Sequence, residues 1–323
     1  MSSPQFSFTT TAEEVATAFA NEIRGKNVLI TGTSLNGIGF EAARVIAKHA
    51  NLVIITGYNA ERLKLSEDAL KQDVPSANIR CLILDLSSLV AVRKAAAEVN
   101  AYSEPIHVLI HNAAAAIGPF KLTVDKLETQ LATAHFGPFL FTKLVSSKLL
   151  AAGTSSYVPR VVFVSSAAHT FGTGVNFETI GKPSAEKYQS MDAYFQSKSA
   201  NILTAIELSK RSKGRINAYS LHPGIIYTNI NQKPESIADM QAIGVLRPDG
   251  TPNTDDHQWK TIPQGAATTV AAAFDPKLNA VSGAYLDDST AANDKISPHS
   301  SDPANAKKLW EATEEILGER FVF

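Results

Sequence analysis

The feature that most constrains the fold of this chain is a regular alternation between short apolar segments and longer segments with helical periodicity. Several short segments are rich in β-branched residues and apolar without a break, which is typical of strands buried on both faces of a parallel sheet. The alternation predicts an α/β fold, with a doubly wound parallel sheet of about seven strands in a single domain. The expected strands are 26–31, 52–56, 79–84, 108–111, 161–165, 216–221 and a weaker one near 283–286, and the expected helices are 39–50, 60–72, 89–101, 125–150, 192–212 and 263–273.

Some parts of the chain depart from this alternation. Residues 1–22 are expected to form an N-terminal arm with a short amphipathic helix over 12–23, ahead of one domain over 23–323. Two irregular stretches, 167–191 and about 225–261, lie inside that domain. Long irregular segments in a compact domain are usually lids or binding loops. A surface insertion without a task is the alternative for each.

Charge and composition disfavour several classes of protein. Thirty Lys and Arg residues against 31 Asp and Glu residues give a formal charge of −1, without the basic footprint of a general nucleic-acid binder. No apolar run approaches the roughly 18 residues of a membrane span. The N-terminus lacks a basic segment followed by an apolar one, so no secretory signal is predicted. The single cysteine, Cys81, excludes an internal disulfide framework. A reducing, cytoplasmic setting fits these features.

A glycine-rich turn directly follows the first expected strand. It reads TGTSLNGIG from Thr31 to Gly39 and leads into an expected helix. Strand, turn and helix together place backbone N–H groups and the positive end of a helix where a pyrophosphate can bind. A plain tight turn is the alternative, because a glycine-rich turn alone is a weak signal. The residues expected to line this site are Gly32, Thr33, Ser34, Asn36, Gly37 and Ile38.

The end of the second strand bears on the choice of dinucleotide. An NAD site usually has a carboxylate here that binds the ribose 2′-hydroxyl, and the run TGYN from Thr56 to Asn59 has none. Arg62 follows in a turn and can meet a 2′-phosphate, although an exposed helix charge is the alternative. We therefore expect NADP(H) rather than NAD(H), with Tyr58, Asn59 and Arg62 lining the cofactor site.

Polar or small residues also end the third and fourth strands. Asp85 and Leu86 follow the third strand, on the side of the sheet where ligands bind in open α/β folds. An N-cap for the next helix is the alternative for Asp85. Asn112, Ala113 and Ala114 follow the fourth strand, and their small side chains let a cofactor lie close to the backbone. An ordinary Ala-rich strand end is the alternative there.

A tyrosine and a lysine one helical turn apart are the candidate catalytic groups. Tyr194 and Lys198 are i and i+4 in the expected helix 192–212, so they share one face. A free phenol has a pKa of about 10 and is a poor base at neutral pH. The ammonium of Lys198 is expected to lower that pKa, helped by a second cation such as oxidised nicotinamide. Ser166, after the fifth strand, is expected to hydrogen-bond the same substrate oxygen.

The order of these features is more specific than any one of them, because a Tyr/Lys pair at this spacing also arises by chance. The sixth strand adds His222-Pro223-Gly224, a turn expected to face the nicotinamide. Ile226 and Thr228 follow it, and the Thr228 hydroxyl is placed to meet the nicotinamide carboxamide.

Metal and hydrolase chemistry have less support. None of the eight histidines forms a pair with metal-ligand spacing, so no metal site is expected. His135 and His169 fall near the expected site, where packing or hydrogen bonding is a more usual role than catalysis. Ser166 lacks the G-x-S-x-G context that a hydrolase nucleophile would have.

Together, these residues resemble the short-chain dehydrogenase/reductase family, and within it the branch of the retinol dehydrogenases and WW-domain oxidoreductases. The resemblance extends over about residues 22–318 and includes SGAYLDD and ANAKKLWEATEEILG near the C-terminus. It implies a Rossmann fold that uses NAD(H) or NADP(H) to interconvert alcohols and carbonyls. It also implies that Tyr194 is the acid/base, that Lys198 lowers its pKa and binds the ribose, and that Ser166 binds the substrate oxygen. Asn112 and Asp85 would line the cofactor cleft.

Three departures from the family pattern accompany this resemblance. Four residues, rather than the usual three, separate the first two glycines of the turn. Tyr58 stands where relatives often carry an arginine for the 2′-phosphate. Ala134, in the stretch AHFGPF, stands where relatives have an asparagine that helps to hold a proton-relay water. Either the relay runs differently, through His135 or a water on backbone carbonyls, or turnover is impaired.

The sequence thus predicts an oxidoreductase of a lipophilic or secondary-metabolite alcohol and its ketone or aldehyde, with residues 225–261 as its substrate loop. The alternatives are a nucleotide-binding or regulatory protein that has lost efficient chemistry, and a non-redox biosynthetic enzyme. A homodimer through the helices after strands four and five is an open expectation. The substrate pocket is expected to be apolar and to draw on Phe136, Phe171, Phe177, Tyr188, Tyr227, Met240 and Trp259.

Overall fold

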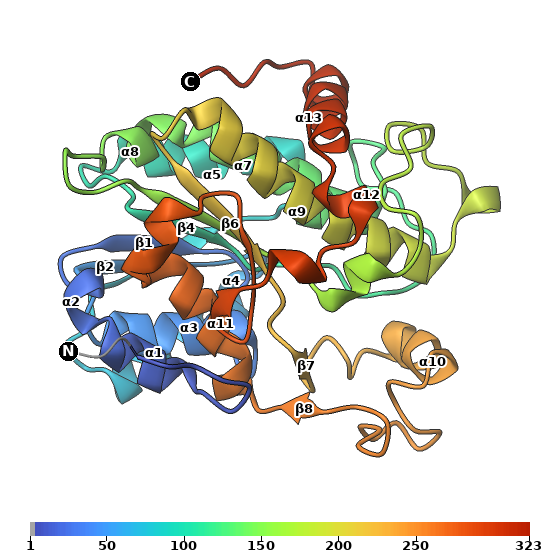
Figure 1. The fold of residues 1–323 in the computed structure, drawn as a ribbon, viewed down its shortest axis with the longest axis horizontal. Helices are drawn as coiled ribbons and strands as arrows, with labels where there is room; N and C mark the ends of the chain where they lie inside the picture. Colours follow the sequence, from blue (N-terminus) through green and yellow to red (C-terminus); the bar gives the residue numbers. More distant parts are fainter. Residues whose placement is uncertain (1–3) are drawn as a thin grey trace.

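The computed structural model describes residues 4–323, and one large sheet with helices on both faces forms its centre (Figure 1). Within these residues the sheet has eight strands in the order β10-β9-β6-β5-β4-β1-β2-β3. Seven of them are parallel to one another, as expected, and β10 adds a short antiparallel edge that is too brief to show in the sequence pattern. The strands are β1 Asn27–Ile30, β2 Leu52–Gly57, β3 Ile79–Ile83, β4 Val108–His111, β5 Arg160–Val164, β6 Asn217–Leu221, β9 Tyr285–Asp287 and β10 Thr290–Ala291.

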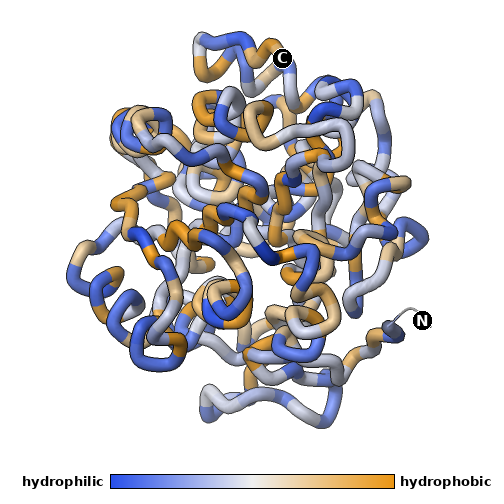
Figure 2. Tube along the Cα trace, turned by 90° about the vertical axis from the view of Figure 1, so that its left-hand side faces the viewer, coloured by the Kyte–Doolittle hydropathy of each residue, from blue (hydrophilic) through white to orange (hydrophobic). Residues whose placement is uncertain are grey.

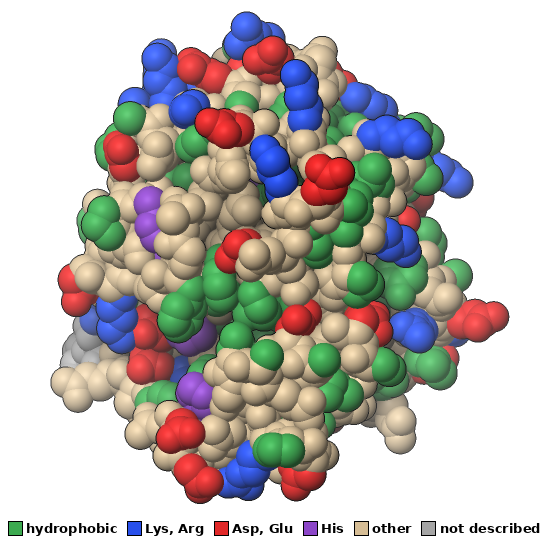
Figure 3. Space-filling view, turned by 90° about the vertical axis from the view of Figure 1, so that its right-hand side faces the viewer, with side chains coloured by type: hydrophobic (Ala, Val, Ile, Leu, Met, Phe, Trp, Pro, Cys, Tyr) green, Lys and Arg blue, Asp and Glu red, His purple; other side chains and the backbone are tan. Residues whose placement is uncertain are grey.

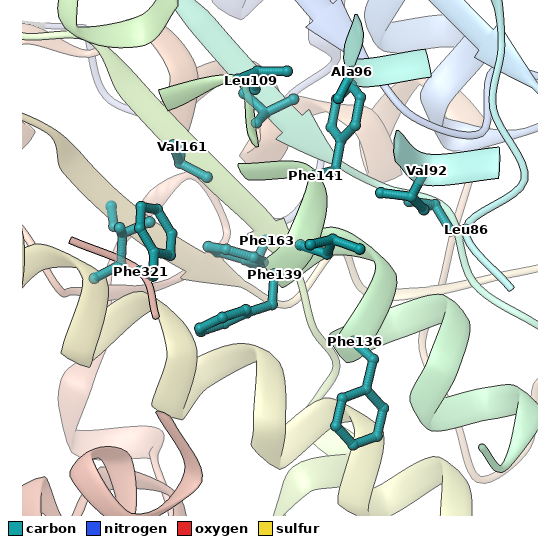
Figure 4. Packing of buried hydrophobic residues seen from close by; sticks show 14 of the residues in the cluster. Leu86, Val92, Ala96, Leu109, Phe136, Phe139, Phe141, Val161, Phe163 and Phe321 are labelled. Carbon is teal, nitrogen blue, oxygen red and sulfur yellow. The ribbon is translucent and has the colours of Figure 1, made fainter. Parts of the chain in front are cut away.

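Helices bury each face of the sheet in a separate hydrophobic core, and Figure 4 shows one of these cores. In β1, Val28 and Ile30 belong to one core and Leu29 to the other, since successive side chains of a strand point to opposite faces. This explains the unbroken apolar strands, and hydrophobic segments run through the middle of the chain trace in Figure 2. One face carries α1 Ala12–Ala18, α2 Ala20–Ile23, α3 Ile38–Ala47, α4 Ala60–Asp73 and α11 Ile262–Phe274, and the other carries α5 Leu89–Ala101, α6 Thr129–Leu131, α7 Gly137–Leu144, α8 Ser146–Leu150, α9 Ser190–Ser212 and α13 Pro303–Leu317.

The N-terminal helix expected over 12–23 is divided at Phe19 into α1 and α2. Thr11 and Glu14 form a capping box that begins α1, and the buried face of this helix packs against α3 and α11. Glu13 forms ion pairs with Arg44 and Lys48 of the α3 region. This part of the chain therefore contributes to the core. The first three residues of the expected arm lie outside the described residues.

The helix expected over 125–150 is wrong as a single element. It is broken into α6, a π-helical turn Ala132–Phe136, α7 and α8. Pro138 provides a physical reason, because it has no N–H to donate to the carbonyl of Ala134, four residues earlier. Gly137 instead donates to the carbonyl of Ala132, five residues earlier.

Residues 225–261 contain more regular structure than expected. β7 Ile225–Ile226 pairs with β8 Trp259–Lys260 as a second, two-stranded sheet, and α10 Pro234–Ala242 lies between them (Figure 1). Ser236 donates a hydrogen bond to the Ile117 carbonyl at 2.8 Å, and Ser190 of α9 donates to Asp239 at 2.7 Å. These bonds join α10 to the body of the protein. In residues 4–323 no helix is both long and apolar enough to cross a membrane.

Candidate active site

The carboxyl ends of the parallel strands meet at one edge of the sheet, where open α/β folds bind ligands. The Thr31 hydroxyl after β1 accepts the backbone N–H groups of Asn112 and Ala113 after β4, at 3.0 and 3.1 Å. The Asn112 amide donates in return to the carbonyls of Thr31 and Gly32, at 3.0 and 2.9 Å. Asn112 therefore holds the glycine turn against the end of β4.

The glycine turn fits closely around these contacts. A Cβ on Gly32, which has φ of +71°, would lie 2.8 Å from the Ala113 Cα, and one on Gly39 would lie 2.3 Å from the Asn112 Nδ2. The extra residue of the turn is accommodated by Asn36, which adopts a left-handed conformation (φ 59°) that asparagine tolerates better than most side chains. Gly37 then caps α3, leaving the free N–H groups of its first turn, from Ile38 on, at this edge.

The end of β2 presents one free cation. Arg62 is exposed and has no ion-pair partner within residues 4–323. Tyr58 is also exposed. The side-chain oxygen of Asn59 is already engaged, because it accepts the Arg62 backbone N–H at 2.9 Å as the N-cap of α4.

At the end of β3, the structure contradicts the N-cap alternative for Asp85. Asp85 does not cap the next helix: its Oδ1 accepts the backbone N–H and the hydroxyl of Ser87 at 2.9 and 2.6 Å, and Ser88 caps α5. The Leu86 side chain is buried in the core. Its carbonyl lies so close to α7 that a Cβ on Gly137 would be 2.2 Å away.

The structure brings Ser166, Tyr194 and Lys198 together across β5 and α9. The Lys198 Nζ lies 5.4 Å from the centroid of the Tyr194 ring and donates to the Val164 carbonyl at 3.2 Å. The Ser166 Oγ accepts the Ala168 N–H at 3.1 Å, which begins a short 3₁₀ turn, Ala167–Thr170, and leaves the hydroxyl proton free to donate. The spacing of Tyr194 and Lys198 on one helix thus places both side chains beside the serine.

The expected direction of the Tyr194 pKa is wrong for the protein without its cofactor. Burial raises the pKa of the Tyr194 phenol above its usual value, and a hydrogen bond from Ser166 opposes this rise. Burial also lowers the pKa of Lys198 to about 8, since a low-dielectric interior disfavours the ammonium. At neutral pH the tyrosine is therefore a phenol, and the lysine is still mostly charged.

The turn after β6 contacts the turn that carries Ser166 through His222. Gly224, with φ of +100°, leaves room for the Lys260 side chain, which an added Cβ would approach to 2.6 Å. Ile226 is buried. The backbone N–H and hydroxyl of Thr228 both donate to the Asn231 Oδ1, at 2.8 and 3.1 Å. The Thr228 oxygen therefore keeps its acceptor capacity.

A cavity of about 530 Å³ opens where α10 meets the first turn of α9. Tyr188 lines it, as expected, and donates its hydroxyl to the Gly118 carbonyl at 2.9 Å. Figure 3 shows hydrophobic side chains gathered between the lower part of this face, where α10 lies, and the body above. The cavity is lined by Gly118, Pro119, Tyr188, Gln189, Ser190, Met191, Glu235 and Asp239.

Two residues expected in the pocket lie in or against the core instead. Phe136 is fully buried in the core, and Phe177 packs against that core under the Lys308 ammonium (Figure 4 shows Phe136). Phe171 is largely exposed beside Phe195, and Tyr227 packs on Trp259. Aromatic side chains suit a core and a pocket equally well, so residue type alone did not separate the two.

The alternative proton relay through His135 is wrong. Both ring nitrogens of His135 are engaged away from the catalytic group, one with Thr313 at 2.7 Å and one with Thr204 at 3.2 Å. Ala134, in the π-helical turn, is buried and cannot hydrogen-bond through its side chain. Nearby on α9, the buried Asn201 donates to the same Val164 carbonyl as Lys198, and its Oδ1 has no partner within residues 4–323. Sequence reasoning missed Asn201, although its i+3 spacing from Lys198 was visible.

The amino-acid sequence is similar to those of several known proteins. The family model described as short chain dehydrogenase matches residues 26–237. The chain is 35% identical over 317 residues to the short-chain dehydrogenase TIC 32 B, chloroplastic, of Brassica napus, covering 95% of this chain and 92% of that protein. It is 32% identical over 320 residues to the human WW domain-containing oxidoreductase, covering 96% and 72%. It is 31% identical over 302 residues to retinol dehydrogenase 12 of Bos taurus, covering 93% and 89%.

Solved structures agree in fold. An uncharacterized protein from Mycobacterium Paratuberculosis is 26% identical with a TM-score of 0.69, and the match covers 94% of this chain and 98% of that one. A short chain dehydrogenase from Burkholderia cenocepacia in complex with NADP has a TM-score of 0.60 at 22% identity, which shows similarity of fold alone. The family match and the relatives of more than 30% identity show that this chain belongs to the short-chain dehydrogenase/reductase family of oxidoreductases, in the branch of the retinol dehydrogenases and WW-domain oxidoreductases.

Proposed function

We propose that this protein is an NAD(P)-dependent dehydrogenase/reductase that interconverts a lipophilic alcohol and its ketone or aldehyde. The observation that carries the proposal is the convergence of Ser166, Tyr194 and Lys198 beside a glycine turn at the carboxyl edge of a parallel sheet. The relative named retinol dehydrogenase 12 supports a lipophilic substrate, because retinol is one.

A dinucleotide fits the residues present. Gly32 and Gly39 have no room for a side chain, which lets the glycine turn pack tightly against the end of β4. The first turn of α3 then offers its free N–H groups to a pyrophosphate. The nicotinamide, when bound, supplies or accepts the hydride. Pro223, Gly224 and Thr228 are proposed to flank the nicotinamide, and Asn112, Ala113 and Ala114 to line the floor of the cleft.

The proton is handled by this chain's own residues. Tyr194, held as a phenol by burial, is proposed to donate its proton to the substrate oxygen during carbonyl reduction. The Ser166 hydroxyl is proposed to donate a hydrogen bond to the same oxygen, where negative charge develops. The Lys198 ammonium favours the resulting phenolate. In alcohol oxidation the same groups act in reverse, which requires a second positive charge near the phenol.

The missing asparagine does not by itself abolish this chemistry. Pro138 cannot donate to the Ala134 carbonyl, and Asn201 presents a buried amide oxygen next to the carbonyl that Lys198 binds. We propose that the backbone of the π-helical turn and the Asn201 amide take over the hydrogen bonding that the asparagine provides in relatives. This favours an active enzyme over a regulatory protein that only binds the nucleotide.

The experiment that tests the function is turnover of the purified protein on a panel of lipophilic ketones, aldehydes and alcohols. We expect oxidation of NADPH with stoichiometric formation of the alcohol. The regulatory alternative is supported instead if the protein binds NADPH tightly, turns over no compound of the panel, and gains no activity in Ala134→Asn. A product formed without net change in the nicotinamide supports a non-redox enzyme.

The proposed preference for NADP(H) rests on Arg62. Replacing Arg62 by Ala should lower kcat/KM for NADPH by roughly tenfold or more, because a hydrogen bond to a charged group contributes about 1.5–3 kcal/mol. The value for NADH should change little, since NADH has no 2′-phosphate. Lys64→Ala is a matched control on the same helix, because Lys64 is exposed and already paired with Glu67 and Asp68. Equal losses for NADPH and NADH in Arg62→Ala would contradict the proposal.

Carbonyl reduction should have an alkaline limit set by Lys198. The pKa of this group is lowered to about 8, so it is charged below that pH and neutral above it. Reduction leaves a phenolate that the ammonium stabilises, so kcat should fall as pH rises through about 8. A pH profile of kcat from 6 to 10 measures this. In Lys198→Arg the guanidinium stays charged at these pH values. The alkaline fall of kcat should therefore move to higher pH, even if the maximal rate is lower. A fall of kcat at the same pH in Lys198→Arg would show that another group causes it.

A homodimer and a cytoplasmic location stay predictions. The chain's own α13 packs along α9, and Phe139 of α7 contacts Trp310 and Phe321, so the C-terminus occupies part of the helix face expected to pair. The relatives named TIC 32 are described as chloroplastic, so the family is not confined to the cytoplasm. The mass of the protein by sedimentation and the location of a tagged copy test the two predictions.

A further inference from the structure

The backbone of the turn that carries Ser166 is held by two histidines from different parts of the chain. His222, directly after β6, accepts the Ala167 N–H through its Nδ1 at 3.0 Å. His169, within the 3₁₀ turn itself, donates its Nδ1–H to the Ser166 carbonyl at 2.7 Å. The two imidazoles thus bind the C=O and the N–H of one peptide group, the one that joins the candidate catalytic serine to Ala167.

Both histidines have fixed protonation states in this arrangement. His222 must keep Nδ1 unprotonated to accept an N–H. His169 must carry its proton on Nδ1, and its Nε2 faces the Ser297 N–H at 3.4 Å. Burial supports the neutral forms, since it lowers the pKa of His169 and lowers that of His222 to about 4. Lysine or arginine, which only donate, cannot take the place of His222.

The two contacts join the serine to distant elements. The His222 backbone donates to the Leu286 carbonyl of β9 at 2.9 Å, and the residue directly precedes Pro223 and Gly224. His169 is buried against the Tyr285 ring, and its carbonyl accepts a bond from His299 of α12 Pro298–Ser301 at 2.8 Å. The turn that faces the nicotinamide and the turn that carries Ser166 are therefore linked directly through one imidazole.

We propose that His222 and His169 are positioning residues, which set the distance between the Ser166 hydroxyl and the nicotinamide-facing turn. This inference rests on the proposed function for the role of Ser166. A displacement of a positioning group by about 1 Å can lower a rate by about 100-fold. The histidines do not touch the substrate or the cofactor in this assignment; they act through the backbone of Ser166 and Ala167.

A pair of substitutions separates positioning from general stability. The Oδ1 of asparagine is attached to Cγ, as Nδ1 is in histidine, so His222→Asn retains an acceptor for the Ala167 N–H. His222→Leu removes it. We expect kcat with NADPH and a carbonyl substrate to fall about tenfold to 100-fold in His222→Leu, and His222→Asn to recover most of that loss. The Kd for NADPH should change far less than kcat.

His107 provides a matched control. It directly precedes β4, so it lies at the amino ends of the strands, away from the candidate site. Its Nδ1 accepts the Asn27 N–H at the same distance of 3.0 Å. His107→Leu should lower the Tm as His222→Leu does, without a comparable loss of kcat. An equal loss of kcat in His107→Leu would show a general effect of stability and overturn the proposal. The proposal would also be overturned if a folded His222→Leu variant kept the parent kcat. The same holds if a folded His222→Asn variant were as slow as His222→Leu.

A second readout does not depend on turnover. Hydrogen exchange of the Ala167 amide, followed by NMR, should be slow in the parent and in His222→Asn and fast in His222→Leu. If the parent turns over no carbonyl, the proposed function fails while this contact is still measured. If the parent is active and the Ala167 amide exchanges equally in all three proteins, the positioning role fails alone. Should His222→Leu not fold, His169→Leu and His169→Asn give the same comparison, since the Asn Nδ2 can donate to the Ser166 carbonyl.

Discussion

Replacing Tyr194 by Phe should lower kcat by about 10³-fold, within the 10²–10⁴-fold range of general acid–base catalysis. The substitution removes one oxygen and leaves the ring, so the packing of α9 is kept. The phenol lies beside both Ser166 and Lys198. Single-turnover kinetics with bound NADPH measure the loss directly, and the Kd for NADPH should stay within about threefold of the parent value.

Tyr102→Phe is the control for this experiment. Its hydroxyl donates to Glu98 at 2.8 Å at the end of α5, away from the carboxyl edge of the sheet. Its loss should leave kcat unchanged. Activity of Tyr194→Phe equal to that of the parent would contradict the proposed mechanism, since a group other than Tyr194 would then have to supply the proton.

Replacing Gly39 by Ala should weaken binding of NADPH by about 100-fold or more. The added methyl would lie 2.3 Å from the Asn112 Nδ2 and 2.6 Å from the Gly32 carbonyl, so the glycine turn must move away from β4. Moving it displaces the first turn of α3, and the loss of two backbone hydrogen bonds to a charged pyrophosphate costs about 3 kcal/mol. Calorimetric titration with NADPH measures the change in Kd.

Gly214→Ala separates this effect from a loss of stability. Gly214 follows α9 with φ of +79° and has open space around it, so an alanine there is strained but touches nothing. It should lower the Tm and leave the Kd for NADPH unchanged. A Gly39→Ala variant that binds NADPH like the parent would show that the turn does not need its close contact with Asn112.

Much of the fold was predictable because its signals are local. The parallel strands carry unbroken apolar runs, since residues such as Val28 and Leu29 face separate cores. Helix α5 was predicted with its observed bounds, because Ser88 caps it and its apolar positions repeat at helical spacing. The helix over 125–150 was not, because its π-helical turn depends on Pro138 and on close packing of Gly137 against the Leu86 carbonyl.

The site was predictable only in part, for a related reason. Tyr194 and Lys198 share one helix, so their proximity follows from i,i+4 spacing alone. The direction of the Tyr194 pKa did not follow, because burial, which the helix itself does not set, raises the pKa and outweighs the hydrogen bond from Ser166. Phe136 and Tyr188 have the same apolar character in the sequence, yet one lies in the core and the other lines the cavity.

The amino-acid sequence by itself determined which chemical groups this protein has at the ends of its strands, and in what order they occur. It also determined that a phenol and an ammonium stand one helical turn apart. The tertiary structure alone decided that His222 meets Ala167, that His135 turns away toward Thr313, and that Asn112 fills the space left by Gly39. Contacts between residues far apart in the chain depend on how whole helices and strands pack, and local sequence patterns do not predict that packing.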